Sequence, residues 1–329
     1  MDQLSKTVYI YCMKNIKIAT AQFENRSGDK EYNLSVIRRL AAKAASQGAN
    51  VIAFHECSIT GYSFARHLNK QEMLDIAEFV PDGPSIQKLQ KIAYEYDIAI
   101  LAGLFEKDAD GKLYKTQACV DKNGLVAKYH KLHPFINPHL TPGNEYVIFD
   151  LFGWKCSILI CYDSNIIENV RAVKLLGADI VFMPHVTMCT PSTRPGAGFV
   201  DPELWKNREA NPTTLRQEFD GLKGRAWLMK WLPARAYDNA IYAIFSNPIG
   251  MDDDQVKNGC SMIIDPFGDI MSECRSFDNE IAIALLTPEK LTQAGGYRYI
   301  KARRPELYGD IIAQPHQSEQ KVVWMSTEE

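Results

Sequence analysis

Three side chains with complementary chemistry stand in short, distinctive segments of this 329-residue sequence. Cys161 lies in LICYDSN, Glu56 in FHECSITGY and Lys131 in AKYHKLHPF. A carboxylate near a thiol can take its proton, and a nearby ammonium favours the thiolate while offering charge to a developing oxyanion. Taken singly, each side chain has a simpler interpretation, as a solvated acid, a surface ammonium or a packed thiol. Together they predict an acyl-transfer site.

The residues around Cys161 place its thiol where a strand gives way to a helix. The apolar run 158–160 is typical of a buried strand. Asn165 followed by Glu168 has the spacing of a helix N-cap and its return partner, and Gly177 is placed to end the helix. Unpaired N–H groups at a helix start favour negative charge, so this position would help a thiolate form and help hold an oxyanion.

Strands and helices alternate through the first half of the chain. Apolar periodicity predicts strands over 16–23, 51–54, 98–105, 113–120 and 125–129, and helices over 33–47 and 85–96. The second strand delivers Glu56 to its carboxyl end. The last two strands form a hairpin around a turn at 121–124, after which Lys131 follows.

The second half repeats this plan. GANVIAFHE (48–56) matches GADIVFMPH (177–185), residue class for residue class, and each follows a helix. The later elements are a helix over 227–240, a strand over 241–246 and a hairpin of 261–264 with 270–273. We therefore predict one α/β domain with an internal pseudo-repeat, whose two halves pack through their sheets and carry helices outside.

Three segments lie outside this plan. Residues 1–12 precede a second methionine, Met13, and are interpreted as an N-terminal extension outside the fold. The domain itself is expected over 13–310, followed by a polar tail over 311–329. The long segment 187–223, rich in Pro, Gly and Thr, is either a lid or substrate-selecting loop or a simple surface insertion.

Composition narrows the class of protein. The chain is 46% apolar, its formal net charge is only -3, and its basic residues are scattered, which argues against nucleic-acid or membrane-surface binding. No apolar run approaches the ~18 residues that span a bilayer, and the start lacks a secretory pattern. Eight dispersed cysteines without a C-x-x-C pair predict reduced thiols and no zinc site. We expect a cytoplasmic protein with a small-molecule partner.

A fourth segment, TPGNEY with Glu145, precedes the strand that leads to Cys161. These four segments, in this order and spacing over nearly the whole chain, resemble the nitrilase superfamily of carbon-nitrogen hydrolases. The resemblance implies a four-layer α-β-β-α sandwich, a catalytic set of Glu56, Lys131 and Cys161, and no metal or organic cofactor. Glu145 would support the set by pairing with Lys131, with a purely structural ion pair as the alternative.

Two departures near the cysteine bear on the substrate. Members that hydrolyse nitriles commonly carry Trp-Glu after the cysteine, whereas this chain has Tyr162 and Asp163, which are more similar to the amidase and carbamoylase branches. Ile167 stands where members often place a proline, which leaves the branch open. We expect hydrolysis of a small linear amide or N-carbamoyl compound through a cysteine thioester. A nitrilase acting on a small nitrile and a catalytically silent metabolite-binding protein are the alternatives.

Several further residues are candidates for the substrate pocket. The backbone N–H of Tyr162 would help hold the oxyanion. Tyr62 and Phe135 would form pocket walls, and His133 and His185 would contact the substrate, although core aromatics and structural imidazoles are the more frequent cases. Exposed helix faces and the polar tail predict a homodimer or a larger homo-oligomer.

Overall fold

A computed structural model describes residues 13–190, 194–318 and 320 of the chain. The interpretation of residues 1–12 as an extension falls outside the described residues, as does most of the predicted tail beyond 318.

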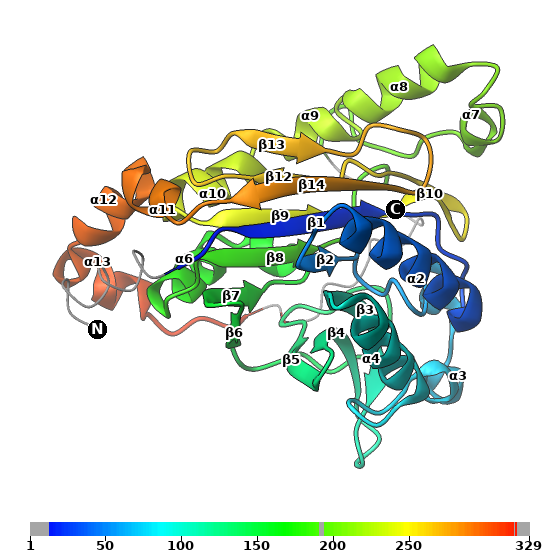
Figure 1. The fold of residues 1–329 in the computed structure, drawn as a ribbon, viewed down its shortest axis with the longest axis horizontal. Helices are drawn as coiled ribbons and strands as arrows, with labels where there is room; N and C mark the ends of the chain where they lie inside the picture. The colour runs from blue at the N-terminus through cyan, green and yellow to red at the C-terminus, as the bar shows by residue number, and fades with distance from the viewer. Residues whose placement is uncertain (1–12, 191–193, 319, 321–329) are drawn as a thin grey trace.

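Two six-stranded sheets form the centre of the fold (Figure 1). The first has the order β14-β1-β2-β3-β4-β5. Its strands are β14 (Glu280–Leu286), β1 (Ile16–Gln22), β2 (Val51–Ala53), β3 (Ala99–Lys107), β4 (Leu113–Asp121) and β5 (Gly124–His130). The second has the order β13-β12-β9-β8-β7-β6. Its strands are β13 (Ile270–Glu273), β12 (Met262–Ile264), β9 (Tyr242–Ser246), β8 (Ile180–Pro184), β7 (Trp154–Ile158) and β6 (Ile148–Leu151). A separate hairpin joins β10 (Ile249–Asp252) to β11 (Gln255–Asn258).

The two sheets share one plan of strand directions. In the first, β1, β2 and β3 are parallel neighbours, and every pairing outside them is antiparallel. In the second, β7, β8 and β9 are parallel neighbours, and again every outer pairing is antiparallel. β2 and β8 lie at the middle of these parallel sets and belong to the matching segments 48–56 and 177–185. The predicted pseudo-repeat is confirmed.

Helices cover the outer face of each sheet. α2 (Lys30–Ser46) and α4 (Pro84–Tyr96) pack against each other over the first sheet, and α6 (Ile167–Leu175) and α10 (Leu232–Asn239) lie over the second (Figure 1). The arrangement is the four-layer α-β-β-α sandwich that the sequence predicts.

Strand residues of the first sheet alternate between two buried layers. Val51 and Leu101 face the second sheet and join a core that contains Ile158 of β7, whereas their neighbours Ile52 and Ile100 pack under α2 and α4. Consecutive strand residues point to opposite faces, and here both faces are buried. This burial explains why the strands are nearly continuous apolar runs rather than alternating patterns.

Hydrogen bonds between the sheets fix one against the other. Thr20 Oγ1 of β1 donates to the carbonyl of Phe245 in β9 at 2.8 Å and lies 2.7 Å from Ser246 Oγ. Ser261 Oγ donates to the carbonyl of Ala21 at 3.0 Å. These buried polar groups satisfy one another across an otherwise apolar interface, which defines a single alignment of the two sheets.

Some expectations about individual elements are wrong. The helix predicted over 227–240 is two helices, α9 (Arg225–Leu228) and α10, because Pro233 lies in the first turn of α10 and cannot continue a preceding helix. The segment 187–223, interpreted from the sequence as a loop or an insertion, contains two helices. They are α7 (Pro202–Lys206) and α8 (Pro212–Asp220). The short helices outside the sandwich are η1 (Ser63–His67), α3 (Lys70–Ile76), α11 (Glu289–Gln293), α12 (Gly295–Lys301) and α13 (Pro305–Ile312).

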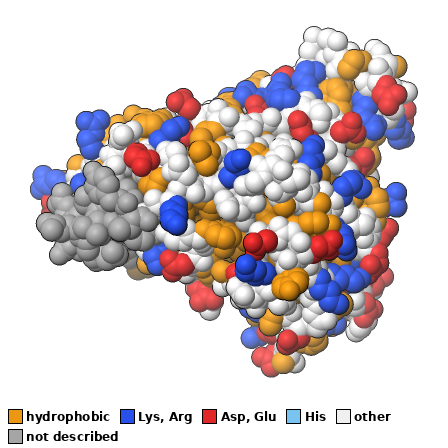
Figure 2. Space-filling model, viewed as in Figure 1, with side chains coloured by type: hydrophobic (Ala, Val, Ile, Leu, Met, Phe, Trp, Pro, Cys, Tyr) orange, Lys and Arg blue, Asp and Glu red, His pale blue; other side chains and the backbone are white. Residues whose placement is uncertain are grey.

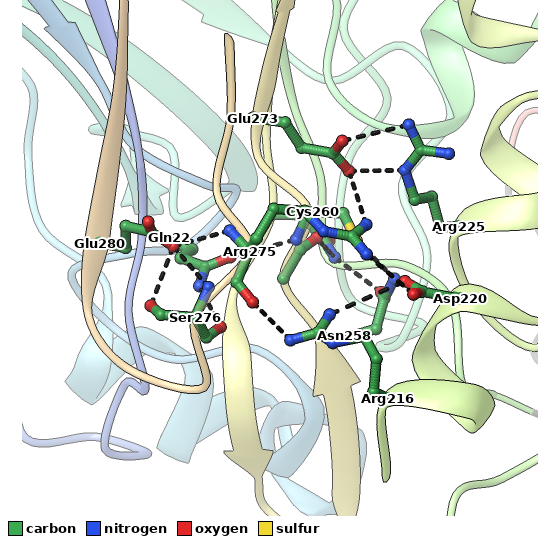
Figure 3. A network of polar contacts seen from close by, with 12 residues as sticks. Gln22, Arg216, Asp220, Arg225, Asn258, Cys260, Glu273, Arg275, Ser276 and Glu280 are labelled. Atoms are coloured by element: carbon green, nitrogen blue, oxygen red, sulfur yellow. Dashed lines mark hydrogen bonds and ion pairs between the residues drawn. The ribbon is translucent and has the colours of Figure 1, made fainter. Parts of the chain in front are cut away.

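Polar contacts fasten α8 and α9 to the second sheet (Figure 3). Arg225 of α9 donates two hydrogen bonds to Glu273 at the end of β13, at 2.7 and 3.1 Å. Arg275 pairs with Asp220 of α8 at 2.8 Å, and Arg216 donates to the backbone carbonyl of Arg275. A two-point guanidinium-carboxylate contact fixes direction as well as distance, so α9 is held in one orientation.

Charged side chains are interspersed on the face of the protein that Figure 2 shows. Basic and acidic groups alternate over this face without a large area of one sign. This face therefore lacks the basic stripe that is typical of nucleic-acid binding. Among the described residues, no helix has the length and apolar character needed to cross a membrane.

His55 is a buried imidazole that makes stability depend on pH. Its side chain is 0% exposed, its ring centroid lies 4.6 Å from that of Phe23, and neither ring nitrogen has a hydrogen-bond partner among the described residues. Burial lowers its pKa to about 3, and the charge of Glu56 opposes this shift only partly. The unfolded chain therefore binds the proton more tightly, and stability falls as the pH drops below the ordinary histidine pKa.

We expect acidification from pH 7.5 to pH 5 to cost about 2 kcal/mol of stability through His55 alone. His55→Gln should remove this part of the pH dependence, measured by urea unfolding at both pH values, whatever its effect at pH 7.5. The exposed His139, changed to Gln, is the matched control and should behave as wild type. An unchanged pH dependence in His55→Gln would show that this imidazole is not held neutral by the fold.

Candidate active site

Cys161 occupies a strained turn after β7. Its backbone angles are φ 52° and ψ −110°, a region that residues other than glycine rarely adopt. Its N–H donates to the carbonyl of Pro184 at the end of β8 (2.9 Å), and Ser164 donates to the Cys161 carbonyl from its N–H (2.9 Å) and its Oγ (2.8 Å). These contacts hold the thiol at the turn, where Cys161 is partly exposed.

The helix after Cys161 begins differently from the expectation. A short helix, α5 (Tyr162–Asn165), starts directly after the cysteine, and α6 starts only after Ile166, which has an extended backbone and makes no side-chain cap. The extended residue separates two helices, so Asn165 ends α5 and is not an N-cap. Gly177 follows the end of α6 with φ 111°, as a C-terminal glycine does.

Glu56 follows β2 in a turn that presses against β3. A side chain on Gly103 of β3 would bring its Cβ within 2.5 Å of the backbone N of Cys57, so only glycine permits this approach. Ile59 N–H donates to the Gly103 carbonyl at 2.9 Å, and Gly103 N–H donates to Ser58 Oγ at 3.1 Å. The turn is thereby fixed, and Glu56 is 1% exposed.

Lys131 is held by backbone contacts on both sides. Its N–H donates to the carbonyl of Lys115 in β4 at 2.9 Å, and its carbonyl accepts from Gly143 N–H at 2.8 Å. A Cβ on Gly143 would lie 2.3 Å from the carbonyl oxygen of His130. The glycine of TPGNEY thus lets this segment pack directly on the strand end that carries Lys131.

Three buried charged side chains meet beside the thiol. Lys131 Nζ donates to Glu56 Oε1 at 2.7 Å, and Lys115 Nζ forms an ion pair with the same oxygen at 3.3 Å. Glu56 Oε2 has no hydrogen-bond partner among the described residues. One carboxylate oxygen is therefore held by two ammonium groups, and the other is left to accept a proton.

Lys115 is a member of this cluster that the motifs do not reveal. It lies in β4, where Leu113, Gln117 and Cys119 share its face of the strand and are buried. Its ammonium lies 4.0 Å from the centre of the Tyr62 ring. The sequence signal that could identify Lys115 is a lysine at an inward position of a buried strand, because lysine is almost never fully buried without a partner.

The cluster sets the protonation states of the site. Burial opposes the charge of Glu56, but Lys131 and Lys115 outweigh it and hold the pKa of this carboxyl below its usual range. Burial also opposes the charge of Lys131, but the negative charges of Cys161, Glu56 and Asp163 raise its pKa. Burial raises the pKa of Cys161 to about 11, with Lys131 acting in the opposite direction. At neutral pH the site holds the carboxylate of Glu56, the ammonium of Lys131 and a protonated thiol, and burial lowers the pKa of Lys115.

Asp163 joins the two halves of the site. Its Oδ2 accepts from Tyr129 OH (2.9 Å) and Leu132 N–H (3.0 Å), and its Oδ1 accepts from His133 N–H (3.0 Å) and lies 2.9 Å from His133 Nδ1. Its side chain is fully buried. The donors surround Lys131 in sequence, whereas Asp163 belongs to the cysteine turn, so one carboxylate fixes the ammonium relative to the thiol.

His133 and His185, which the sequence predicts to contact the substrate, are not among the described residues that line the cavity. His133 bonds to Asp163, and His185 lies beneath the cysteine turn with Nε2 2.9 Å from Ser164 Oγ. Burial lowers the pKa of His185 to about 3, and the charge of Glu56 opposes this shift only partly, so the imidazole is neutral. Both side chains support the turn as hydrogen-bonded structural imidazoles.

A cavity of about 470 Å³ opens onto Cys161. Tyr62, Phe135 and Tyr162 line it, and the Tyr162 ring meets the Phe135 ring edge-on with centroids 5.1 Å apart. The other lining residues are Arg66, Ile136, Asn165, Val186, Thr187, Met188, Thr190, Arg194, Trp227, Trp231, Arg235, Gln255 and Lys257. The volume and the mainly apolar walls with a few polar groups suit a small molecule.

Glu145 lies apart from this cluster. Its side chain is exposed, and no ion pair joins it to Lys131 among the described residues. A fully buried ammonium needs a buried counter-charge, and Glu56 supplies it. The described residues therefore show Lys131 paired with Glu56 and not with Glu145.

Cys161 is the most accessible of the described thiols. Seven cysteines fall within the described residues; all are free, and all except Cys161 are buried. Within the same residues no group of three His, Cys, Asp or Glu side chains is arranged to hold a metal ion.

Fold and site together define an α/β sandwich of two repeated sheets with a thiol at a strained turn beside a buried carboxylate and two buried ammonium groups. A sequence model described as carbon-nitrogen hydrolase matches residues 17–295, and the chain belongs to this family. The resemblance to the nitrilase superfamily is thereby confirmed.

Known relatives are distant but cover most of the chain. A nitrilase of Pyrococcus abyssi is 26% identical over 82% of this chain and 88% of its own length. An N-carbamoylputrescine amidase of Solanum lycopersicum is 24% identical over 90% of this chain and 95% of its own. Among solved structures, an amidase from Nesterenkonia sp. AN1 superposes with a TM-score of 0.65 at 22% identity, covering 90% of this chain and 96% of that one. This last likeness is one of fold.

The contact of Gly143 with the strand end should control the reactivity of Cys161. In Gly143→Ala the added methyl group would force the His130 carbonyl to move, and this would displace the neighbouring Lys131 from its place beside the thiol. The thiolate would lose favourable charge, so we expect alkylation of Cys161 by iodoacetamide to slow about tenfold, as one pKa unit implies.

The control is Gly309→Ala, because Gly309 lies exposed in α13 with open space around its Cβ position. The two variants should be compared by the time course of peptide modification in mass spectrometry. Equal alkylation rates in wild type and Gly143→Ala would contradict this role of the glycine.

Proposed function

We propose that this protein hydrolyses a non-peptide carbon-nitrogen bond in a small linear amide or N-carbamoyl compound, through a thioester on Cys161. Membership of the carbon-nitrogen hydrolase family supports the reaction class, and the name of one relative, N-carbamoylputrescine amidase, supports the substrate class, while the name of another, nitrilase, keeps a small nitrile as the alternative. The observation that carries the proposal is the arrangement of Glu56, with one oxygen held by Lys131 and Lys115 and the other without a partner among the described residues.

In the first half of the reaction, Cys161 Sγ attacks the carbonyl carbon as its proton passes to Glu56 Oε2. The new S–C bond pushes the carbonyl electrons onto oxygen. Lys131 and the backbone N–H of Tyr162 would stabilise this oxyanion, a role in which losing one donor costs about 10²- to 10³-fold in rate. The C–N bond then breaks as Glu56 returns the proton to nitrogen. Ammonia or an amine leaves, and the acyl group stays on sulfur.

In the second half, water attacks the thioester carbon while Glu56 takes one of its protons. The S–C bond breaks, the acid leaves, and the sulfur recovers its proton from Glu56. The raised pKa of the thiol makes a base necessary, because a thiol with a pKa of about 11 carries almost no thiolate at neutral pH. The lowered pKa of Glu56 keeps that base ionised.

A panel of small linear amides, ureido acids and nitriles should identify the substrate class. We expect ammonia release from amides or ureido compounds, abolished in Cys161→Ala and reduced about 10²- to 10⁴-fold in Glu56→Gln. Peptide mass spectrometry should show Cys161 alkylated faster than the buried thiols.

Cys274→Ala, at a buried cysteine outside the cavity lining, is the control and should retain turnover. Turnover confined to nitriles would contradict the substrate class. If Cys161 reacts no faster than the other thiols and Cys161→Ala keeps its activity, the thioester mechanism is wrong. If no member of the panel is hydrolysed either, the alternative of a catalytically silent metabolite-binding protein is favoured.

The second lysine of the cluster should control the pH range of activity. Lys115 helps to hold the pKa of Glu56 down, so the base stays ionised until the pH falls through that lowered value. Lys115→Met should raise the pKa of Glu56 and move the acid limb of kcat/KM to higher pH by about one unit. Lys112→Met, at an exposed position just before β4, should leave the profile in place. A profile that does not move in Lys115→Met would exclude this role.

The remaining features of the proposal concern the protein as a whole. We propose one domain over residues 13–310 followed by a tail, action in the cytoplasm without a cofactor, and a homodimer or larger assembly. Exposed apolar side chains on α13 support the assembly, with Leu307 60%, Ile311 70% and Ile312 65% exposed.

A further inference from the structure

A buried cation lines the cavity without an ion-pair partner. Lys257 lies in β11, is 1% exposed and belongs to the lining of the cavity that opens onto Cys161. Its Nζ donates to Gln255 Oε1 at 2.7 Å, which is an uncharged acceptor. Among the described residues, no carboxylate lies within ion-pair distance of this ammonium. An ammonium has three N–H donors, so its hydrogen-bonding capacity is not filled by Gln255.

The charge of Asp252 acts to raise the pKa of Lys257, although the two side chains do not form an ion pair among the described residues. The Asp252 carboxylate accepts from Ser63 N–H at 3.1 Å, from Ser63 Oγ at 2.6 Å and from Tyr62 N–H at 3.4 Å. Burial lowers the pKa of Lys257, and the negative charges of Asp252 and other groups, Cys161 included, oppose this shift only partly. Burying an ammonium is costly unless an anion compensates it, so this position gains from an anion brought by a ligand.

The described lining of the cavity carries cationic side chains and no Asp or Glu. Arg66 is neutralised by Asp253 and Asp254, at 3.1 and 2.6 Å. Arg235 donates to two backbone carbonyls, and Arg194 stacks on an indole ring of α9 at 3.7 Å. Lys257 is therefore the fully buried cation of the lining, and the described lining supplies no carboxylate to balance its charge. A buried cation without such a partner attracts an anion into the cavity.

Gln255 and the Lys257 ammonium can together offer hydrogen-bond donors to a ligand in the cavity. It lines the cavity, is 5% exposed, and its amide oxygen already accepts from Lys257. The part of its amide that remains to serve a ligand is the NH₂ group. An ammonium beside an amide NH₂ offers donors to both oxygens of one carboxylate, and a bond between ions is stronger than one between neutral groups.

We propose that the substrate carries a carboxylate that binds Lys257 and Gln255, while its amide or carbamoyl carbonyl lies at Cys161. This inference rests on the proposed function, because it assigns the far end of the substrate whose carbonyl Cys161 attacks. The substrate class is then a short linear molecule with an amide or ureido group at one end and a carboxylate at the other.

Matched substrates test the carboxylate directly. Succinamate and butyramide have chains of similar length and differ by one carboxylate, as do N-carbamoyl-β-alanine and N-propylurea. We expect wild type to favour the anionic member of the pair that it hydrolyses by at least about 10-fold in kcat/KM. Lys257→Met should lose about 10- to 100-fold on the anionic member, mainly through KM, and change the neutral member less than about twofold. Lys206→Met, at an exposed lysine of α7, is the control.

A binding measurement does not depend on turnover. Succinate, the product expected from succinamate, should protect Cys161 of wild type from iodoacetamide at constant ionic strength, with sodium chloride as the reference. Protection should be lost in Lys257→Met and kept in Lys206→Met. Stronger protection by inorganic phosphate than by succinate would overturn the assignment to a carboxylate.

The outcomes separate this inference from the proposed function. Equal loss on succinamate and butyramide in Lys257→Met, or no preference in wild type, would overturn the carboxylate site and leave amide hydrolysis standing. If no panel member is hydrolysed but succinate protects Cys161 through Lys257, the anion site stands and the proposed reaction fails. Thermal unfolding of Lys257→Met, together with its turnover of the neutral substrate, shows whether the variant is folded.

Discussion

The buried carboxylate of Asp163 is the constraint on which the site depends. It comes from the cysteine turn of the second half, and its donors, Tyr129, Leu132 and His133, come from the end of the first sheet. A buried carboxylate that loses such donors is left with an uncompensated charge, which costs several kcal/mol. The cysteine turn and the end of the first sheet therefore cannot easily shift relative to each other. The sandwich aligns two sheets, but this one side chain sets the position of the Lys131 ammonium relative to the thiol.

The two copies of the structural repeat end in different functional side chains. β2 leads to Glu56, whereas the equivalent β8 leads to His185, which burial keeps neutral. Glu56, Lys131 and Lys115 therefore come from the first half, and Cys161 and Asp163 come from the second. The side chains of Lys131 and Lys115 lie beside Glu56, and both act to lower the pKa of the thiol. Their charges favour negative charge on sulfur or on substrate oxygen before any substrate enters.

Much of the fold follows from local patterns, because strands buried on both faces form apolar runs that the segments 51–53 and 180–184 display clearly. Glu56, Lys131 and Cys161 stand at strand ends, where neighbouring residues identify them. The structure places the three together, as predicted, and their roles in catalysis remain a prediction. Helix boundaries were less predictable, since the helical pattern continues across Pro233 although the backbone cannot.

Other parts of the site depend on contacts between distant residues, which sequence spacing does not report. Lys115 reaches Glu56 only through the register of β4 beside β3, and Glu145 cannot be told from a buried acid until its exposure is known. The place of His133 beside Lys131 and of His185 at the end of a strand predicts both in the pocket, whereas their hydrogen bonds direct them to Asp163 and Ser164.

β14 pairs with all seven residues of β1, yet it is formed by residues 280–286, near the end of the chain. On a ribosome, β1 would therefore emerge as the unpaired edge of an unfinished sheet and keep that edge until Leu286 left the exit tunnel. An open strand edge invites pairing with other chains. The first half of this protein is thus translated early but completed late, so the two similar halves cannot mature as independent units.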